Sequence, residues 1–231
     1  EDYLEALSTL VEAYERTLAA KPGMSGLDLL RHLVEANDLS AADFAAYEAK
    51  QRRPLHSTYR GYTVYGMPPP SAGGLAVLQI LGILEPFALQ QYQPLAVDSV
   101  HLITEAERLA YADRARYVAD SDFVDVPVAG LLDRHYLATR SQLIRMTQSL
   151  GIAPPGEPRH AQTPQFGDDR ALELPSTSHL SIVDAQGHAL AMTTSIEAAF
   201  GSHIMVNGYL LNNQLTDFSF APVDGGKPVA N

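Results

Sequence analysis

The chain has 231 residues, 46% of them hydrophobic and 19% charged, and a formal net charge of −11. Its length and composition suit a globular protein with a substantial core, and its acidic balance excludes nucleic acid and anionic membrane as main partners. The absence of cysteine excludes disulfides, thiolate metal sites and cysteine nucleophiles.

Neither a membrane span nor a metal site is expected. No apolar run reaches membrane-spanning length, and no signal-type segment opens the chain. The eight histidines show no HExxH or other paired metal spacing. We therefore predict no metal and no cofactor.

The first half of the sequence is predicted to be mainly helical. Apolar residues recur at steps of three and four over residues 4–18, and Ser25 and Ser40 each precede an acid by three positions, as at helix starts. A strand is expected next, over 60–65, and then an apolar helix over 75–84 capped by Ser71. A second helix is expected over 98–117, and a third over 133–150, ended by Gly151. The residues of the second helix expected to face inward are Leu102, Ile103, Ala106, Leu109 and Ala110.

The second half has a different pattern. Residues 152–176 are rich in proline and have no period, which predicts a linker. Strands are then expected over 179–184 and 188–194, joined by a turn at 185–187, and over 208–212. Helices followed by strands predict an α+β fold with layered αββα packing.

Thr177 is the candidate nucleophile, because it stands where the linker ends and the first strand begins. A plain strand start is the ordinary explanation of such a threonine. If the Ser176–Thr177 bond were cut, however, Thr177 would carry both a hydroxyl and a free α-amine. Such an amine titrates near ~7.7–8.0, so it suits the role of general base for its own hydroxyl.

Several segments resemble the γ-glutamyltransferase family. The resemblance is carried by 59–74, 110–114, 120–123, 177–184 with Gly187, 193–201 and 210–219. The first three resemble the end of the family's large subunit, and the others resemble the start of its small subunit. On this basis residues 1–151 are a mainly helical large-subunit portion, 152–176 the linker, and 177–231 the β-rich start of the small subunit. Together they would form one incomplete domain.

The resemblance implies an N-terminal-nucleophile (Ntn) hydrolase fold and self-cleavage between Ser176 and Thr177. It implies γ-glutamyl substrates such as glutathione, with water or an amino acid as acceptor. Carried over by position, Thr177 is the nucleophile and Ser195 supports it where the family has threonine. Gln214 and Asp217 match residues that hold the substrate's α-ammonium group.

Glu197 departs from the family pattern, because many members have asparagine there. An acid at this position would still bind an ammonium group through a charge-assisted hydrogen bond. It would lie on the same face as Ser195 if the strand continued. Alternatively, it reshapes the pocket for another amide, such as a cephalosporin-type side chain or poly-γ-glutamate, or it is a solvated acid at a strand end. A further alternative is an inactive homologue or fragment that serves as a scaffold.

Two family parts are expected outside this sequence. They are the arginine that grips the substrate carboxylate, upstream, and the paired glycines of the oxyanion hole, downstream; Gly225-Gly226 is predicted to be an ordinary loop. N- and C-terminal parts of the same protein are therefore expected to complete the site. The resemblance also implies a periplasmic or extracellular location.

Overall fold

The structure is a computed structural model that describes residues 48–159, 166–167, 177–206, 209–214 and 223–230. The chain divides into two compact units, each described by itself here. The helical unit is the described part of residues 51–173 and 214–231, and the hairpin unit is the described part of residues 1–50 and 174–213. The helices predicted before residue 48 lie outside the described residues.

The helical unit begins with an antiparallel pair of strands, β1 (Leu55–Tyr59) and β2 (Tyr62–Gly66). Arg60 and Gly61 form the two-residue turn between them, with φ of 49° and 85°. The predicted strand over 60–65 therefore corresponds to β2 but began too early, and β1 was missed. The polar residues of β1 gave it only a weak alternation.

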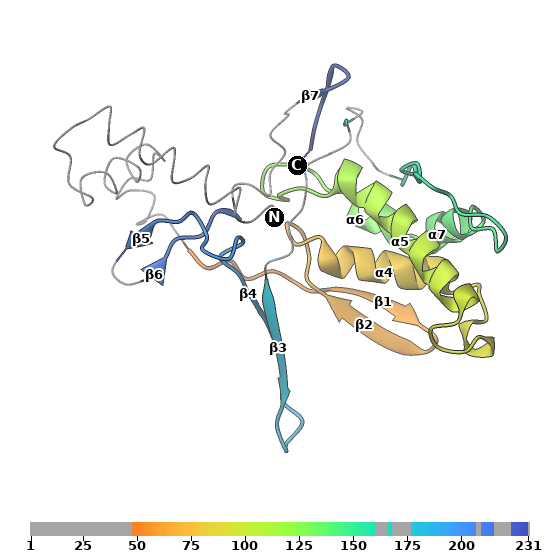
Figure 1. Cartoon of the computed structure of the whole chain (residues 1–231), viewed down its shortest axis with the longest axis horizontal. Helices are drawn as coiled ribbons and strands as arrows, with labels where there is room; N and C mark the ends of the chain where they lie inside the picture. The colour runs from red at the N-terminus through yellow and green to blue at the C-terminus, as the bar shows by residue number, and fades with distance from the viewer. Residues whose placement is uncertain (1–47, 160–165, 168–176, 207–208, 215–222, 231) are drawn as a thin grey trace, which may run out of the picture. The chain divides into compact units, whose positions relative to one another are not determined.

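Helix α4 (Gly73–Leu84) is the centre of this unit. It contacts the β1–β2 sheet and also α5 and α7, which explains why the sequence of α4 is apolar on nearly every side (Figure 1). The prediction of this helix is confirmed, but the predicted cap is wrong: Ala72 occupies the N-cap and no side chain caps the helix. A Cβ on Gly74 would lie 2.3 Å from the carbonyl oxygen of Met67, so only glycine allows the preceding loop to approach this closely.

The longest helix, α5 (Val97–Tyr117), confirms the prediction over 98–117. Four of its five predicted inward residues are buried, whereas Ile103 is 40% exposed. The 3₁₀ turn η1 (Leu89–Gln91) joins α4 to α5. The main core of the unit comes from these helices and the segment after them, and consists of Leu75, Ile83, Leu84, Leu102, Ala106, Leu109, Val118, Ala119, Val126, Leu131, Tyr136, Leu137 and Ile144.

Two short helices follow, α6 (Val128–Leu131) and α7 (Arg134–Ser141). The side chain of Asp133 caps α7 by accepting a hydrogen bond from the backbone N–H of Tyr136 at 2.9 Å. The predicted helix over 133–150 is therefore wrong in its second half. Residues after Ser141 continue as tight turns, in which Leu143 N–H donates to Arg140 and Ile144 N–H to Ser141.

The buried side chain of Asp113 on α5 binds residues of both α4 and α7. Its side chain is fully buried and accepts hydrogen bonds from Gln79 Nε2 on α4 at 3.0 Å and from Tyr136 Oη on α7 at 2.7 Å. Arg140 Nη2, also on α7, forms an ion pair with it at 3.2 Å. Burial raises the pKa of the Asp113 carboxyl, and the Arg140 charge with the hydrogen bonds offsets part of that rise.

The start of the proline-rich segment is bound to the same helices. Gly156 N–H donates to Asp113 Oδ1 at 2.7 Å, and the Gly156 carbonyl accepts from Tyr117 Oη at 2.6 Å. The Pro154 carbonyl accepts from Arg140 Nη2 at 2.8 Å. A Cβ on Gly156 would lie 2.2 Å from Tyr136 Oη, so glycine is required for this close packing.

Glu105, two helical turns before Asp113 on α5, binds Ser149 and Leu150, which come just before the proline-rich segment. Its carboxylate accepts from Ser149 Oγ at 2.8 Å and from Leu150 N–H at 2.6 Å. Burial raises the pKa of Glu105, but these two hydrogen bonds and the charges of His101 and Arg108 outweigh it and leave the pKa below its ordinary value. Two buried carboxylates on one helix thus hold residues 149–156.

The described end of the helical unit is a small hairpin of β7 (Val223–Asp224) and β8 (Lys227–Pro228). Gly225 and Gly226 form its turn with φ of 57° and 80°, which is the left-handed geometry that two-residue hairpin turns require. The prediction that these glycines form a loop is confirmed. Gly167 N–H donates to the Pro228 carbonyl at 2.8 Å beside this hairpin.

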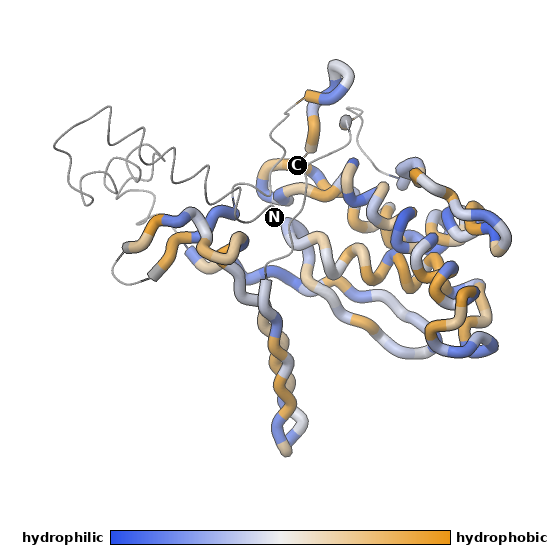
Figure 2. Tube along the Cα trace, in the orientation of Figure 1, coloured by the Kyte–Doolittle hydropathy of each residue, from blue (hydrophilic) through white to orange (hydrophobic). Residues whose placement is uncertain are grey.

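The hairpin unit consists mainly of β3 (Ser178–Val183) and β4 (Ala189–Thr194), which pair antiparallel from Ser178↔Thr194 to Val183↔Ala189. Both predicted strands are confirmed. Figure 2 shows that the two strands are predominantly hydrophobic and the tip hydrophilic. The unit also contains the short pair β5 (Met205–Val206) and β6 (Tyr209–Leu210), the latter within the strand predicted over 208–212.

Candidate functional site

The candidate site lies where β3 begins and β4 ends. The hydroxyl of Thr177 donates a hydrogen bond to Ser195 Oγ at 3.1 Å. Thr177 directly precedes β3 and Ser195 directly follows β4, so the two residues extend the register of the hairpin by one position. Thr177 is exposed and Ser195 is half-buried. The predicted nucleophile and its predicted support are therefore in direct contact.

The tip of the hairpin holds the two strands in this register. Asp184 Oδ1 accepts from the backbone N–H groups of Gln186 and His188, at 2.9 and 2.8 Å. Asp184 Oδ2 contacts His188 Nδ1 at 2.7 Å, and this bond with the backbone bonds lowers the pKa of Asp184. Gly187 adopts φ of 87°, which confirms the predicted turn over 185–187. The backbone hydrogen bonds of this turn therefore set the register with which the two strands reach Thr177 and Ser195.

Ser195 Oγ also accepts a hydrogen bond from the backbone N–H of Glu197 at 2.8 Å. Two donors thus converge on one hydroxyl oxygen, which fixes its position beside Thr177. Strand β4 ends at Thr194 and Glu197 has a φ of 65°, so the condition for Glu197 to share a strand face with Ser195, that the strand continues, is not met. The backbone turns at this residue, and it does so in the left-handed region that asparagine adopts far more readily than glutamate.

Asn213 is a structural residue of the site that the sequence reasoning missed. Its Oδ1 accepts from Ala198 N–H at 3.0 Å, and its own N–H donates to the Ile196 carbonyl at 3.3 Å. These bonds hold the turn after Ser195 to the end of the 209–213 segment. The run of residues 210–219 was part of the resemblance, but only Gln214 and Asp217 in it received a predicted role.

A close backbone approach supports the same turn. Gly201 adopts φ of 55°, and a Cβ there would lie 2.0 Å from the Leu211 carbonyl oxygen. Ser202 N–H donates to that carbonyl at 2.9 Å. The turn after Ser195 is therefore packed against the β6 end of the unit by both hydrogen bonds and a glycine contact.

The remaining predicted site residues are not brought to Thr177 by any described contact. Gln214 directly follows Asn213 and is half-buried, and it belongs to the helical unit by its contacts. Ser176 and Asp217 lie outside the described residues. Their predicted roles stay predictions.

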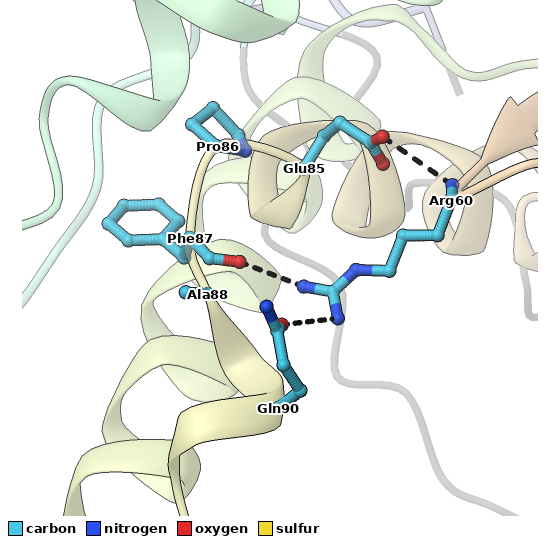
Figure 3. Close-up of a pocket in the computed structure, with 6 residues that line it drawn as sticks. All are labelled: Arg60, Glu85, Pro86, Phe87, Ala88 and Gln90. Carbon is cyan, nitrogen blue, oxygen red and sulfur yellow. Dashed lines mark hydrogen bonds between the residues drawn. The ribbon is translucent and has the colours of Figure 1, made fainter.

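A cavity of about 440 Å³ lies in the helical unit, next to the β1–β2 turn (Figure 3). Two charged residues, Arg60 and Glu85, line it, and the Arg60 guanidinium donates to the Phe87 carbonyl at 2.8 Å and to Gln90 Oε1 at 2.9 Å. The Arg60 guanidinium also lies 5.1 Å from the centre of the Tyr59 ring. These contacts fasten the turn to the end of α4, so we interpret the cavity as a surface hollow beside a structural arginine.

In the described part of the chain, no group of three or more His, Asp or Glu side chains is arranged to hold a metal ion. No helix among the described residues is long and apolar enough to cross a membrane.

Comparison with known families gives a match over nearly the whole chain. Residues 23–230 match the family described as Gamma-glutamyltranspeptidase. The chain is 39% identical over 186 residues to the glutathione hydrolase proenzyme of Escherichia coli K12, covering 80% of this chain and 30% of that protein. It is 34% identical over 186 residues to the acylase ACY 1 proenzyme of Pseudomonas sp. SE83, covering 80% and 31%.

Solved structures agree with these matches. The gamma-glutamyltranspeptidase of Helicobacter pylori superposes with a TM-score of 0.52 at 33% identity, over 64% of this chain and 44% of that chain. The cephalosporin acylase of Bacillus halodurans superposes with a TM-score of 0.67 at 26% identity, over 98% and 39%.

These neighbours and the α+β elements define part of an Ntn-hydrolase fold. The chain belongs to the gamma-glutamyltranspeptidase family. It spans about 30% of the length of the Escherichia coli relative and 31% of the acylase.

Proposed function

We propose that this chain carries the processing site and the nucleophile of a γ-glutamyl amide hydrolase or transferase that acts on glutathione-type substrates. The observation that carries the proposal is the 3.1 Å hydrogen bond from Thr177 Oγ1 to Ser195 Oγ at the start of β3. It is supported by family membership and by the glutathione hydrolase names of several relatives. Residues 1–151 and 177–231 are then portions of two subunits, separated by the linker 152–176.

Processing would proceed within the chain. Thr177 Oγ1 attacks the carbonyl carbon of Ser176, the C–N bond between the two residues breaks, and the acyl group moves to Oγ1 as an ester. The Thr177 nitrogen takes up a proton and becomes a free amine. Water then hydrolyses the ester, which releases a carboxylate on Ser176 and restores the Thr177 hydroxyl. Several relatives are named proenzymes, which fits such a maturation step.

Turnover uses the same two groups of Thr177. The free amine accepts the hydroxyl proton, and Oγ1 attacks the γ-carbonyl carbon of the substrate. The leaving amine takes that proton as its C–N bond breaks, and a γ-glutamyl ester remains on Thr177. Water releases glutamate, whereas an amino-acid acceptor forms a new γ-glutamyl amide. Ser195, held by Glu197 N–H, orients the attacking oxygen.

Substrate binding would involve Glu197, Gln214 and Asp217. In this proposal the carboxylates of Glu197 and Asp217 and the amide of Gln214 bind the substrate α-ammonium group, the carboxylates by charge-assisted hydrogen bonds. Because the chain spans 30% of the Escherichia coli relative, we propose that further parts of the same protein contribute to the site. The location we propose is periplasmic or extracellular, as the original resemblance implies.

A related acylase is the second candidate, and two observations support it. Glu197 stands where many family members have asparagine, and the cephalosporin acylase of Bacillus halodurans superposes over 98% of this chain. Comparing γ-glutamyl with glutaryl amides separates the two candidates, because a glutaryl group lacks the α-ammonium. A preference for glutaryl amides that Glu197→Asn reverses would establish the acylase.

The decisive experiment is to measure the intact mass and first residue of the smaller piece of the full-length protein. We expect a cut between Ser176 and Thr177, and a single uncut band for Thr177→Ala with no turnover of a γ-glutamyl anilide. A full-length protein that remains one band, or a Thr177→Ala variant that still turns over, contradicts the proposal and leaves the scaffold interpretation.

A further inference from the structure

The hairpin that carries Thr177 has two chemically different faces. Residues directly opposite in an antiparallel pair share a face, and alternate residues along a strand do too. One face therefore carries the pairs Ser178↔Thr194, Leu180↔Met192 and Ile182↔Leu190, and the other carries His179↔Thr193, Ser181↔Ala191 and Val183↔Ala189. Thr177 and Ser195 extend the second face, which is polar at the end beside Thr177.

His179 occupies the position next to Thr177 on this face and bonds across the hairpin. Its Nδ1 contacts Thr193 Oγ1 at 2.8 Å, and its Nε2 contacts Ser181 Oγ at 3.2 Å. A neutral imidazole has one donor and one acceptor nitrogen, and a hydroxyl serves as either, so both contacts are hydrogen bonds in either tautomer. Both ring nitrogens are engaged by these two hydroxyls, which indicates a structural task for the ring and not proton transfer at Thr177.

The contact with Thr193 is placed where the hairpin is weakest. The β3–β4 ladder ends at Ser178↔Thr194, and the ends of strands open most easily. If the bond before Thr177 is cut, as in the proposed function, Thr177 keeps a covalent neighbour on one side only. Apart from the Thr177–Ser195 bond itself, the His179–Thr193 bond is the nearest described side-chain link between the two strands on the face of Thr177.

We propose that His179 is a positioning residue for Thr177: by bonding Thr193 across the hairpin, it keeps Thr177 Oγ1 within hydrogen-bond distance of Ser195 Oγ. This inference rests on the proposed function. A positioning role differs from a general role in stability. It predicts that kcat falls when the His179–Thr193 contact is lost, but not when another hydrogen bond of the hairpin is removed.

The chain offers a matched control in the same hairpin. His188 is at the opposite end, where it is 83% exposed and pairs with Asp184 in the tip. Removing either imidazole deletes a side-chain contact of the hairpin. Only the removal of the His179 imidazole deletes a contact that lies beside Thr177.

The test uses the full-length protein with His179→Ala, His179→Gln, Thr193→Val, the double variant His179→Ala/Thr193→Val, His188→Ala and Thr177→Ala. For each, the rate of self-cleavage, the kcat and KM for a γ-glutamyl anilide, and the Tm are measured. We expect His179→Ala and Thr193→Val each to lower kcat between about three- and tenfold, as loss of one hydrogen bond predicts, with KM within about twofold. The double variant is no slower than either single one, because both remove the same bond.

His179→Gln is expected to recover most of the kcat, since its amide offers a donor and an acceptor to the same two hydroxyls. His188→Ala is expected to leave kcat unchanged even if its Tm falls. An unchanged kcat in both Thr193→Val and His179→Ala, or an equal loss in His188→Ala, overturns the inference. Thr193→Val keeps the test valid if His179→Ala fails to fold. A wild-type protein whose cleavage and turnover do not depend on Thr177 overturns the proposed function, and this inference with it.

Discussion

The hydroxyl of Thr177 donates to Ser195 Oγ, and that same oxygen accepts the backbone N–H of Glu197. A serine hydroxyl that accepts two hydrogen bonds has little freedom to rotate away from its neighbour. The geometry at Thr177 is therefore set by a local hairpin and the turn that follows it, within 21 consecutive positions of the chain, 177–197.

Ser195→Ala is expected to lower kcat for a γ-glutamyl anilide about tenfold with little change in KM. The variant removes an acceptor that orients the attacking oxygen, which costs about 0.5–1.5 kcal/mol for one hydrogen bond. Ser195→Thr keeps the hydroxyl and should remain near the wild-type rate. Steady-state kinetics of the processed full-length protein measure both, and a tenfold rise in KM instead of the fall in kcat would contradict the orienting role.

Glu197→Asn is expected to raise the free energy of unfolding by about 0.5–1 kcal/mol. The φ of 65° at this residue is left-handed, a region that costs most side chains roughly 1–2 kcal/mol and that asparagine tolerates. Glu197→Gln removes the same charge but keeps the side-chain shape, so it should not stabilise the protein. Chemical denaturation of the three proteins distinguishes a backbone effect from a charge effect.

Gly156→Ala is expected to destabilise the helical unit by about 1–3 kcal/mol, because its Cβ would meet Tyr136 Oη at 2.2 Å. Tyr136→Phe removes that oxygen and should recover part of the loss when combined with Gly156→Ala. The combination is measured as a double-mutant cycle in urea. Simple additivity of the two variants would mean that the contact is not the cause.

Asp113→Ala is expected to cost about 3–5 kcal/mol, because it leaves the buried Arg140 guanidinium without its carboxylate partner. The pair of Arg52 and Asp122 provides the comparison, since its atoms are 2.8 Å apart but its side chains are 26% and 30% exposed. Asp122→Ala should cost no more than about 1 kcal/mol. Similar losses for the two aspartates would show that burial does not decide the effect.

Glu105→Gln is expected to destabilise the protein at neutral pH and to matter less in acid. The folded pKa of Glu105 is lower than its ordinary value of 4.5, so the stabilisation is complete above that value and is lost as the pH falls through the folded pKa. Thermal unfolding of both proteins from neutral to acidic pH checks this. A difference in Tm that stays constant across the range would contradict the assignment.

The sequence predicted the elements whose pattern is local. The apolar run of α4, the period of α5 and the β3–β4 hairpin with its Gly187 turn were all found at their predicted positions. The predicted helix beyond Ser141 failed because Glu105 binds Ser149 and Leu150 there, and a tertiary contact of this kind leaves no periodic signal.

At the site, the sequence predicted the Thr177–Ser195 pair but not its surroundings. The pair follows from the family resemblance together with the hairpin register, and both are readable from one chain. Three features of the surroundings were not predicted: the left-handed turn at Glu197, the bond from Ala198 to Asn213 and the cross-strand bond of His179. They depend on the backbone direction after Thr194 and on the strand register, which are fixed only when the strands are placed opposite each other.

The alternation of faces along β3 and β4 also restricts how the length of this hairpin can change. Inserting one residue between Thr177 and Ile182, with the turn at 184–188 unchanged, would move the residues before the insertion to the opposite face, so that Thr177, the proposed nucleophile, would no longer share a face with Ser195. Inserting residues between Asp184 and His188 lengthens only the exposed tip. Single-residue insertions should thus be tolerated at the tip and abolish chain cleavage when placed between Thr177 and Ile182.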